Sequence, residues 1–284
     1  QHAGALQVIK RTVTAIVDNV LHLNNRLDKN AWLSESAIAS SLFPLMTAQG
    51  VNDVHVSDLV LDGSCGQNET LNGNYVGGLF IQHCNHHLYE RIISRNYAGD
   101  GFSFQVCDDI RFDNCEAVNN LQLGFHPGSG SQRPILNQCI ATGNNQGLFF
   151  CWGVTHGKVS SSDFSNNREY GVSFGHRDTD NHLFQCKIES NGIFGILFRE
   201  EISNFRGAHR NCIEECLFSG NGYQNGGIAI QCYGNPCNVE LKANRFENSG
   251  KQKIGLKVSN EDHGFILKDN IFVEMEKNIT ADED

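Results

Sequence analysis

The sequence contains little that would predict helices, membrane spans or a basic surface. Its 284 residues include only 4 Pro, 2 Trp and 2 Met, and no long segment has apolar residues at the period of a helix. No apolar run reaches the roughly 18 residues that a membrane-spanning helix needs. Lys and Arg number 22 against 32 Asp and Glu, which gives a formal net charge of −10. Nucleic acid is therefore excluded as an expected partner, because phosphate binding needs a basic surface.

Glycine, by contrast, is abundant, and many of the 29 Gly recur in one motif. In this motif Gly is followed by apolar residues at the first and third positions after it, as in Gly171-Val172-Ser173-Phe174. Copies begin at Gly78, Gly101, Gly124, Gly147, Gly171, Gly195, Gly227 and Gly255. The copies lie 23 or 24 residues apart as far as Gly195, and the next intervals are 32 and 28 residues. The chain is therefore predicted to be a repeat array with loops inserted towards its C-terminal end.

Short alternating segments and Asn-rich turns complete each repeat. One Asn falls near the same point of successive repeats, at Asn96, Asn120, Asn144, Asn167, Asn191, Asn221 and Asn248. A period near 23 residues also fits leucine-rich repeats, but the Leu consensus and the helical segment of that fold are missing. Short strands and Asn turns instead predict an all-β fold, a single-stranded parallel β-helix whose coils stack about 4.8 Å apart. The recurring Asn residues are expected to form a ladder of stacked amides inside one turn.

The first 50 residues lack the repeat. Residues 8–17 and 20–23 predict two strands around a turn at Asp18 and Asn19, and Ser34 to Phe43 fits either a short helix or a further strand. Because a solenoid must shield its open ends, residues 1–50 are predicted to form a β cap or the remnant of a preceding β lobe. Residues 51–284 are predicted to form the β-helix domain. The chain begins at Gln1 rather than Met, so a processed N-terminus is expected.

The 11 Cys do not fit a small disulfide framework, because their number is odd and they are spread over a long chain. Four of them recur at similar places in successive repeats and are expected to be small buried core residues: Cys115, Cys139, Cys186 and Cys216. Cys232 and Cys237 enclose a tight turn and are the pair best suited to a disulfide.

The period-two alternation of a strand places the residue between the two apolar positions of each motif on the outer surface. The expected outer row is Phe80, Ser103, His126, Phe149, Ser173, Leu197, Ala229 and Lys257. The expected second row is Gln82, Gln105, Gly128, Cys151, Gly175, Arg199, Gln231 and Ser259. Trp152, His176-Arg177-Asp178 and Glu200-Glu201 follow where the strands turn. Stacked coils would bring these side chains together in one groove.

The residues of this groove between Gly101 and Glu201 predict a polysaccharide site. Exposed aromatic side chains such as Phe149 and Trp152, beside charged ones, are unusual on a merely solvated surface. The candidate catalytic residues are His126, His176, Arg177, Asp178, Arg199 and Glu200. The candidate substrate-binding residues are Asp100, Gln105, Phe149, Trp152, Ser173, Asp180 and Glu201. The alternative is an ordinary solenoid surface on which Arg177 pairs with Glu201 and Arg199 with Asp178.

Proton abstraction beside a uronate carboxylate fits these residue types. An Arg neutralises the carboxylate through its planar fork, and a neutral His takes the proton. Arg177 or Arg199 would be the neutralising group. His126 or His176 would be the base.

Glycoside hydrolysis is a second chemistry that the residues fit, since two carboxyl groups can flank a scissile bond as acid and base. Asp178 would serve with Glu200 or Glu201, and Asp100 is a further candidate carboxyl group.

The sequence predicts no metal or other cofactor. Four residues lie close together near the start of the array, namely His83, Cys84, His86 and His87. Alternation along a strand would send neighbours to opposite faces, which disfavours a zinc site there. Four carboxylates offer calcium as the alternative: Asp178, Asp180, Glu200 and Glu201.

The segment Leu123-Gly124-Phe125-His126-Pro127-Gly128 resembles the Tyr-Gly-Phe-Asp-Pro-His motif of the mannuronan carbon-5 epimerases. Gly, Phe and Pro match, whereas Leu123, His126 and Gly128 stand where that family has Tyr, Asp and its catalytic His. With its coils and Asn ladder, the chain looks like the right-handed parallel β-helix superfamily, which includes pectate lyases and alginate-modifying enzymes. The resemblance implies a right-handed coil, an acidic polysaccharide substrate and a secreted, periplasmic or cell-surface location.

The expected function is thus that of a carbohydrate-active enzyme acting on a uronate-containing polysaccharide by lyase or epimerase chemistry. One alternative is an inverting glycoside hydrolase with paired carboxylates, and the other is a non-catalytic glycan-binding or adhesion solenoid. The expected partner is a polysaccharide or oligosaccharide, and the oligomeric state stays open.

Overall fold

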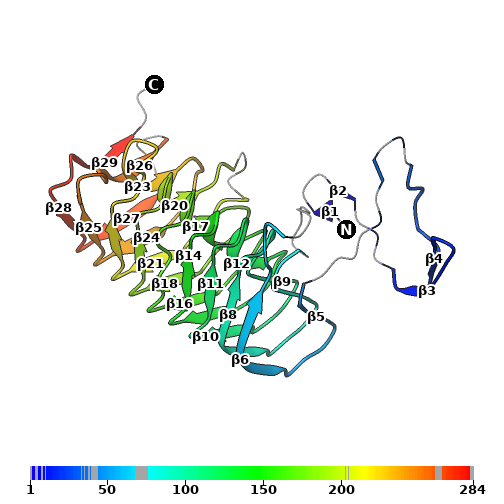
Figure 1. Ribbon diagram of the computed structural model, residues 1–284. Helices are drawn as coiled ribbons and strands as arrows, with labels where there is room; N and C mark the ends of the chain where they lie inside the picture. The colour runs from blue at the N-terminus through cyan, green and yellow to red at the C-terminus, as the bar shows by residue number, and fades with distance from the viewer. Residues whose placement is uncertain are drawn as a thin grey trace.

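The protein is an all-β solenoid in a computed structural model, and its coils follow one another along a single axis (Figure 1). The structure describes residues 2–3, 6–7, 9, 11–32, 34, 36–37, 39, 44–67, 76–201, 203, 205–259 and 264–281. The strands of the solenoid all pair in parallel with those of the neighbouring coils. The predicted parallel β-helix is therefore confirmed.

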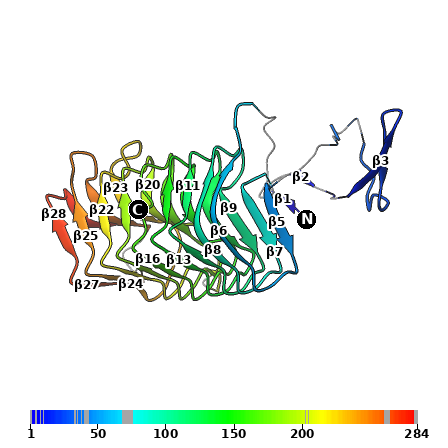
Figure 2. The same cartoon turned by 60° about the horizontal axis from the view of Figure 1, so that its bottom comes forward.

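Three parallel sheets form the walls of the solenoid (Figure 2). The front sheet contains β5 (Met46–Gln49), β7 (Leu79–Gln82), β9 (Phe102–Gln105), β12 (Leu123–Gly128), β15 (Gln146–Phe149), β17 (Tyr170–Phe174), β20 (Phe194–Phe198), β23 (Ile228–Cys232), β26 (Ile254–Val258) and β29 (Lys277–Ala281). The back sheet contains β6 (His55–Asp62), β8 (Leu88–Arg95), β10 (Arg111–Asp113), β11 (Glu116–Val118), β13 (Ile135–Asn137), β14 (Ile140–Thr142), β16 (Lys158–Ser160), β18 (His182–Phe184), β21 (Cys212–Glu214), β24 (Val239–Lys242) and β27 (Phe265–Lys268). The side sheet contains β19 (Lys187–Glu189), β22 (Leu217–Ser219), β25 (Arg245–Glu247) and β28 (Ile271–Val273).

The core lies between these sheets and is built from stacked apolar side chains. Phe150 stacks on Phe174 with ring centroids 4.8 Å apart, and Phe174 stacks on Phe198 at 5.2 Å. Each ring occupies the third position of its motif, so the same core position repeats from coil to coil at the strand spacing. This stacking shields both faces of each ring from water and stabilises the coils against one another.

The cysteines behave as core residues. Cys115, Cys139, Cys186 and Cys216 are buried, as predicted from their recurrence. The predicted disulfide between Cys232 and Cys237 is wrong: both thiols are free, with Cys232 buried and Cys237 exposed.

The predicted Asn ladder is present, although its ends differ from the prediction. Five of the predicted Asn and one Gln form it, each side chain donating to the next, in the order Asn120, Asn144, Asn167, Asn191, Asn221 and Gln252. Asn96 instead donates to Asp62, and Asn248 donates to the Glu274 carbonyl near the surface. The ladder satisfies polar groups that the turn would otherwise bury without partners.

The N-terminal segment contains the predicted hairpin. Strands β3 (Val13–Val17) and β4 (Val20–Leu23) pair antiparallel around Asp18 and Asn19, whose φ angles of 47° and 64° suit a tight hairpin turn. Strands β1 (His2–Ala3) and β2 (Leu6–Gln7) form a second small antiparallel pair.

The β3–β4 hairpin lies within residues 1–50, the segment predicted to form a β cap or the remnant of a preceding β lobe. Most of its side chains are exposed, and it stands away from the coils in both views (Figures 1 and 2). Strand β5 pairs in parallel with β7, so the front sheet begins at Met46, before the predicted domain boundary at residue 51. The predicted element between Ser34 and Phe43 lies largely outside the described residues.

No helix within the described part of the chain has the length and apolarity required to cross a membrane.

Candidate functional site

The outer row predicted from the Gly motif lies on the outer face of the front sheet. Parallel pairing joins Phe80 to Ser103 and Ser103 to His126, and Phe149 to Ser173 and Leu197 further along. The row then continues through Gln231 rather than the predicted Ala229, because Ile196 pairs with Ile230. Ile230 stays in the core as predicted, but Ala229, predicted to face outward, also lies in the core, and Ile228 packs in a smaller apolar cluster with Phe194 and Leu197.

The outer row is more buried than the sequence predicts. Ser103, His126 and Ser173 are all buried, and Phe149 is half-buried rather than exposed. The cause is that longer side chains from neighbouring coils bend across glycines. A Cβ on Gly128 would lie 2.4 Å from the Gln105 amide oxygen, and one on Gly175 would lie 2.6 Å from Arg199 Nε. Gln105 also donates to Ser103 and accepts from Ser129, so both of its amide atoms are engaged.

His126 is held by Asp100, which belongs to the preceding coil. The Nδ1 atom of His126 lies 2.7 Å from Asp100 Oδ2, and the Leu123 amide donates to the other carboxylate oxygen at 3.1 Å. Burial lowers the pKa of His126, but the Asp100 carboxylate and Cys151 raise it more, to about 10. The charged imidazolium form of His126 is therefore favoured, and its role as a base stays a prediction.

Arg199 and Asp178 form a buried ion pair at 3.1 Å, as one predicted alternative held. The Asp178 carboxylate also accepts from the amides of Gly153, Val154 and Gly175 at 2.9 to 3.0 Å. Burial raises the pKa of Asp178 to about 6, so the group is ionised at neutral pH. The Asp178 side chain is 0% exposed and holds Arg199, and its catalytic role stays a prediction.

The Arg199 guanidinium is fully organised by its surroundings. It donates to Ser173 Oγ at 2.6 Å and to the Phe150 carbonyl at 2.8 Å, and its Cζ lies 4.2 Å from the centre of the Phe149 ring. These contacts fix a positive charge beside an aromatic face on the outer side of the sheet.

His176 is the accessible histidine of the site. Its Nδ1 contacts Glu201 Oε1, and its backbone amide donates to the same oxygen at 2.9 Å. Glu201 is buried, whereas 39% of the His176 side chain is exposed, and the His176 ring lies 5.1 Å from the Trp152 ring. Glu200, a candidate catalytic residue, is exposed, and Glu201 rather than Glu200 contacts His176. The predicted Arg177–Glu201 pair is likewise replaced by His176–Glu201.

An open cleft of about 570 Å³ lies next to His176, at the turn that follows the front sheet. Its lining comprises Gly130, Trp152, Gly153, Thr155, Arg177, Thr179, Phe205, His209 and Arg210. Trp152 is 60% exposed and Phe205 is 92% exposed, so two aromatic faces are presented to solvent there. The lining contains two Arg and one His but no Asp or Glu, and because Arg210 is paired with Asp180, Arg177 supplies the positive charge of the cleft.

The loop that carries Phe205 is tied to the coil below it. The Arg177 amide donates to the Arg206 carbonyl at 2.6 Å, and Arg210 makes two bonds of 2.7 Å to the Asp180 carboxylate. Asp180 is thereby engaged as an anchor for the loop, and its contact with substrate stays a prediction.

The sequence did not predict three residues that line the cleft, namely Phe205, His209 and Arg210. All lie in the inserted segment between Gly195 and Gly227, where the repeat offers no register. The lengthened interval was the signal that a loop stands at this point, but the position of the loop depends on its contacts with Arg177 and Asp180.

The carboxylates considered for calcium do not converge. Asp178 is bound to Arg199, Asp180 to Arg210 and Glu201 to His176. The residues near the start of the array do not gather either, since His83 and His86 are exposed while Cys84 and His87 are buried.

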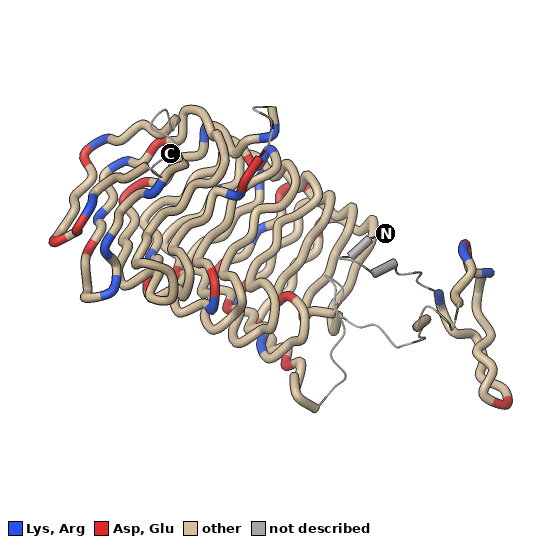
Figure 3. Tube along the Cα trace, turned by 90° about the horizontal axis from the view of Figure 1, so that it is seen from above, with Lys and Arg blue, Asp and Glu red and all other residues tan. Residues whose placement is uncertain are grey.

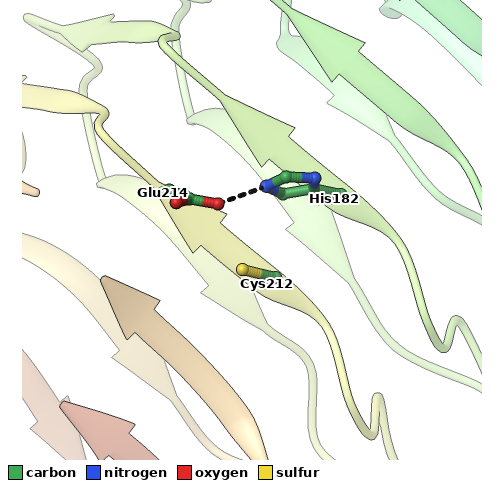
Figure 4. Close-up of side chains that lie close together, drawn as sticks. All are labelled: His182, Cys212 and Glu214. Carbon is green, nitrogen blue, oxygen red and sulfur yellow. Dashed lines mark hydrogen bonds and ion pairs between the residues drawn. The ribbon is translucent and has the colours of Figure 1, made fainter. Parts of the chain in front are cut away.

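A group of possible metal ligands lies instead on the back sheet, where His182, Cys212 and Glu214 have ligand atoms within 4.8 Å of one another (Figure 4). Glu214 already contacts His182 at 3.1 Å and Lys242 at 2.6 Å, so the ammonium group of Lys242 would compete with a metal ion for the Glu214 carboxylate. Such pairs between coils are common in this part of the solenoid, and Figure 3 shows basic and acidic residues alternating towards the C-terminal end.

Comparison with known proteins is consistent with this architecture. The family model described as "Right handed beta helix region" matches residues 57–205, and no curated protein sequence matches the chain. The A-module of the mannuronan C-5 epimerase AlgE4 from Azotobacter vinelandii is similar in structure, with a TM-score of 0.60, 16% identity, and coverage of 83% of this chain and 74% of that one.

Two further solved structures show how diverse the similar proteins are. A mutant of the periplasmic alginate epimerase AlgG has a TM-score of 0.65 at 13% identity, covering 87% of this chain and 65% of its own. The Streptococcus pneumoniae surface protein and adhesin PfbA has a TM-score of 0.54 at 12% identity, covering 80% of this chain and 76% of its own. At these identities the likeness concerns the fold.

Proposed function

Because the chain belongs to the right-handed β-helix family, we propose that it binds an acidic polysaccharide at the cleft beside His176 and acts on it by proton abstraction, as a lyase or an epimerase. The observation that carries the proposal is the combination of an accessible His, oriented by a buried carboxylate, with a basic aromatic cleft. Solved structures with a similar fold include a mannuronan C-5 epimerase and an alginate epimerase.

His176 is the proposed base. With Nδ1 turned to Glu201, the neutral imidazole carries its proton on Nδ1 and presents the Nε2 lone pair for proton abstraction. The buried Glu201 carboxylate also stabilises the imidazolium that forms when the proton is taken.

The proposed substrate is a uronate-containing chain. Arg177 is exposed in the cleft next to His176 and would neutralise the sugar carboxylate, which acidifies the neighbouring C–H bond. Trp152 and Phe205 would pack against the faces of sugar rings. Arg199 is less suited to the neutralising role, since it is 17% exposed and is engaged by Ser173, Phe150 and Asp178.

The geometry supports hydrolysis less well. An inverting glycosidase needs two carboxyl groups that reach opposite faces of a sugar ring. The side chains of Asp100, Asp178 and Glu201 are only 4%, 0% and 4% exposed, and each already holds a partner. A polymeric substrate and the periplasmic or surface setting of similar proteins favour a location outside the cytoplasm.

The test is incubation with a panel of uronate-containing and neutral polysaccharides. New ultraviolet absorbance from a conjugated double bond would identify a lyase, and deuterium uptake at the sugar carbon from heavy water, without cleavage, would identify an epimerase. New reducing ends without the absorbance would favour hydrolysis. Glycan binding with no change in any polymer would contradict the enzymatic proposal and favour the non-catalytic solenoid.

A matched pair of variants tests the base. His176→Asn is expected to abolish the reaction, whereas His182→Asn is not, although His182 also contacts a Glu of the next coil and is 41% exposed. Equal activity of the two variants would contradict the proposed role of His176.

A further inference from the structure

One buried polar atom near the cleft has no hydrogen-bond partner within the described structure: Nε2 of His126. His126 is 5% exposed, and its Nδ1 is occupied by Asp100. Buried polar groups are almost always paired, so an orphaned nitrogen on a charged ring needs an explanation. The proposed proton abstraction does not use this residue.

Cys151 lies on the side of His126 that faces the next coil. It pairs in parallel with Gly128, two residues beyond His126 on the same strand, and the Gln105 amide covers Gly128 from the other side. The Phe149 ring meets the His126 ring edge-on at 5.5 Å and so closes the neighbouring position. The Cys151 side chain contributes to the raised pKa of His126, in agreement with this placement.

The surroundings of Cys151 suit a nucleophile. Its side chain is half-buried rather than sealed in the core, unlike most cysteines of this chain. Two cations flank it, because His126 is an imidazolium and the Arg199 guanidinium is close enough to interact with it electrostatically. In cysteine–histidine catalytic pairs the sulfur nucleophile lies beside an imidazole that can exchange a proton with it.

We propose that Asp100, His126 and Cys151 form a second catalytic site, a thiol-based triad that removes acyl ester groups from a glycan lying along the front sheet. The three residues come from three successive coils and follow one diagonal, with the imidazole between the carboxylate and the thiol. In a catalytic triad the carboxylate, the imidazole and the nucleophile follow one another in a line, as these three side chains do. In a metal site the ligand atoms would instead all point to one ion.

The chemistry balances without any further reactant except water. The Cys151 thiolate attacks the ester carbonyl carbon, a C–S bond forms, and the sugar oxygen leaves with the proton from His126 Nε2. Water then attacks the thioester while His126 Nε2 takes its proton, and the carboxylic acid leaves as the C–S bond breaks. Asp100 is a positioning residue, since it holds the imidazole through Nδ1 and touches no reacting atom.

An acyl ester is the substrate class that fits a thiolate in this position. An ionised uronate carboxylate is not electrophilic enough for thiolate attack, whereas an O-acetyl group is. Cys151 directly precedes Trp152, so the proposed ester site and the aromatic cleft lie at neighbouring points of one surface. A glycan held by Trp152 would therefore place a nearby acyl group within reach of the thiol.

The experiment uses the whole chain with 4-nitrophenyl acetate and then with an O-acetylated polysaccharide. We expect a burst of nitrophenol, an increase in protein mass equal to one acetyl group on Cys151, and release of acetate from the polymer. Cys151→Ala should abolish all three signals, and His126→Asn should slow acylation by about 100-fold or more. Asp100→Asn should lower kcat for acetate release with little change in KM.

Cys212→Ser is the matched control, because Cys212 is also half-buried and is the register partner of a histidine on the back sheet. It should retain the acetyl adduct and acetate release. His126 is buried and its variant needs a thermal unfolding control, but Cys151→Ala decides the question independently. Absence of an adduct on Cys151, or full acetate release by Cys151→Ala, would overturn the proposal.

The two proposals fail separately. Double-bond formation or deuterium uptake reports on His176, whereas acetate release reports on Cys151, and both are measured on the same protein sample.

Discussion

The carboxylate of Glu201 contacts Nδ1 of His176 and also accepts a hydrogen bond of 2.9 Å from the His176 backbone amide. The buried Glu201 carboxylate on the next coil therefore holds His176 at both its ring and its backbone amide. Glu201→Gln would keep the size of the side chain but lose its charge, so the imidazolium formed in the reaction would be less stable. We expect kcat to fall by about 10- to 100-fold with little change in KM. Steady-state kinetics on the polysaccharide identified by the panel would check this, and an unchanged kcat would contradict the proposed pairing of roles.

The two exposed aromatic side chains of the cleft are expected to supply glycan affinity. Replacing Trp152 or Phe205 by Ala removes a stacking surface worth about 1 kcal/mol or more, so each change should weaken binding by roughly fivefold or more. Trp32→Ala is a suitable control, because Trp32 is 58% exposed near the N-terminal hairpin, far along the chain from the cleft. Titration calorimetry with oligosaccharides would measure the effect. If Trp32→Ala weakened binding as much as Trp152→Ala, the cleft would not be the glycan site.

Two Arg–Asp pairs in neighbouring positions should differ greatly in their contribution to stability. The Arg199–Asp178 pair is buried, and removing Arg199 leaves a buried carboxylate with an unpaired charge, which costs about 3 to 5 kcal/mol. Arg210–Asp180 is an exposed pair, and Arg210→Ala should cost about 1 kcal/mol or less. Urea denaturation of Arg199→Ala and Arg210→Ala would compare them. Equal losses of unfolding free energy would show that Asp178 is satisfied by its three backbone amides alone.

Stability should fall with rising pH because of His126. Its pKa is raised from 6.5 to about 10 in the folded protein, so the folded state binds the proton more tightly than the unfolded state. The stabilisation is complete below about pH 6.5 and is lost as the pH rises towards about 10, by up to about 1.4 kcal/mol per pH unit. The difference in unfolding free energy between the wild type and Asp100→Asn, measured across this window, isolates the effect. A difference that does not depend on pH would contradict the ion pair.

The repeat alone was sufficient to predict the solenoid, because each coil must satisfy the same local rules. A Gly followed by apolar residues at fixed positions places Phe150, Phe174 and Phe198 in one stack, since side chains alternate strictly within a strand. The ladder through Asn144 and Asn167 follows from the same periodicity. The ends of the ladder did not follow, because Gln252 replaces Asn248 in a coil of different length.

The pairing of side chains at the turns was decided only by the tertiary structure. The alternation of inward and outward side chains ends with the strand, so it does not predict which of Glu200 and Glu201 is buried. The structure shows that Glu201 is buried and contacts His176. Likewise, the sequence by itself determined that His126 and Cys151 face the same surface. Only the fold buried His126 against Asp100, left its Nε2 without a partner and brought Phe205 over to Trp152, because burial and loop position depend on contacts between coils that no local pattern encodes.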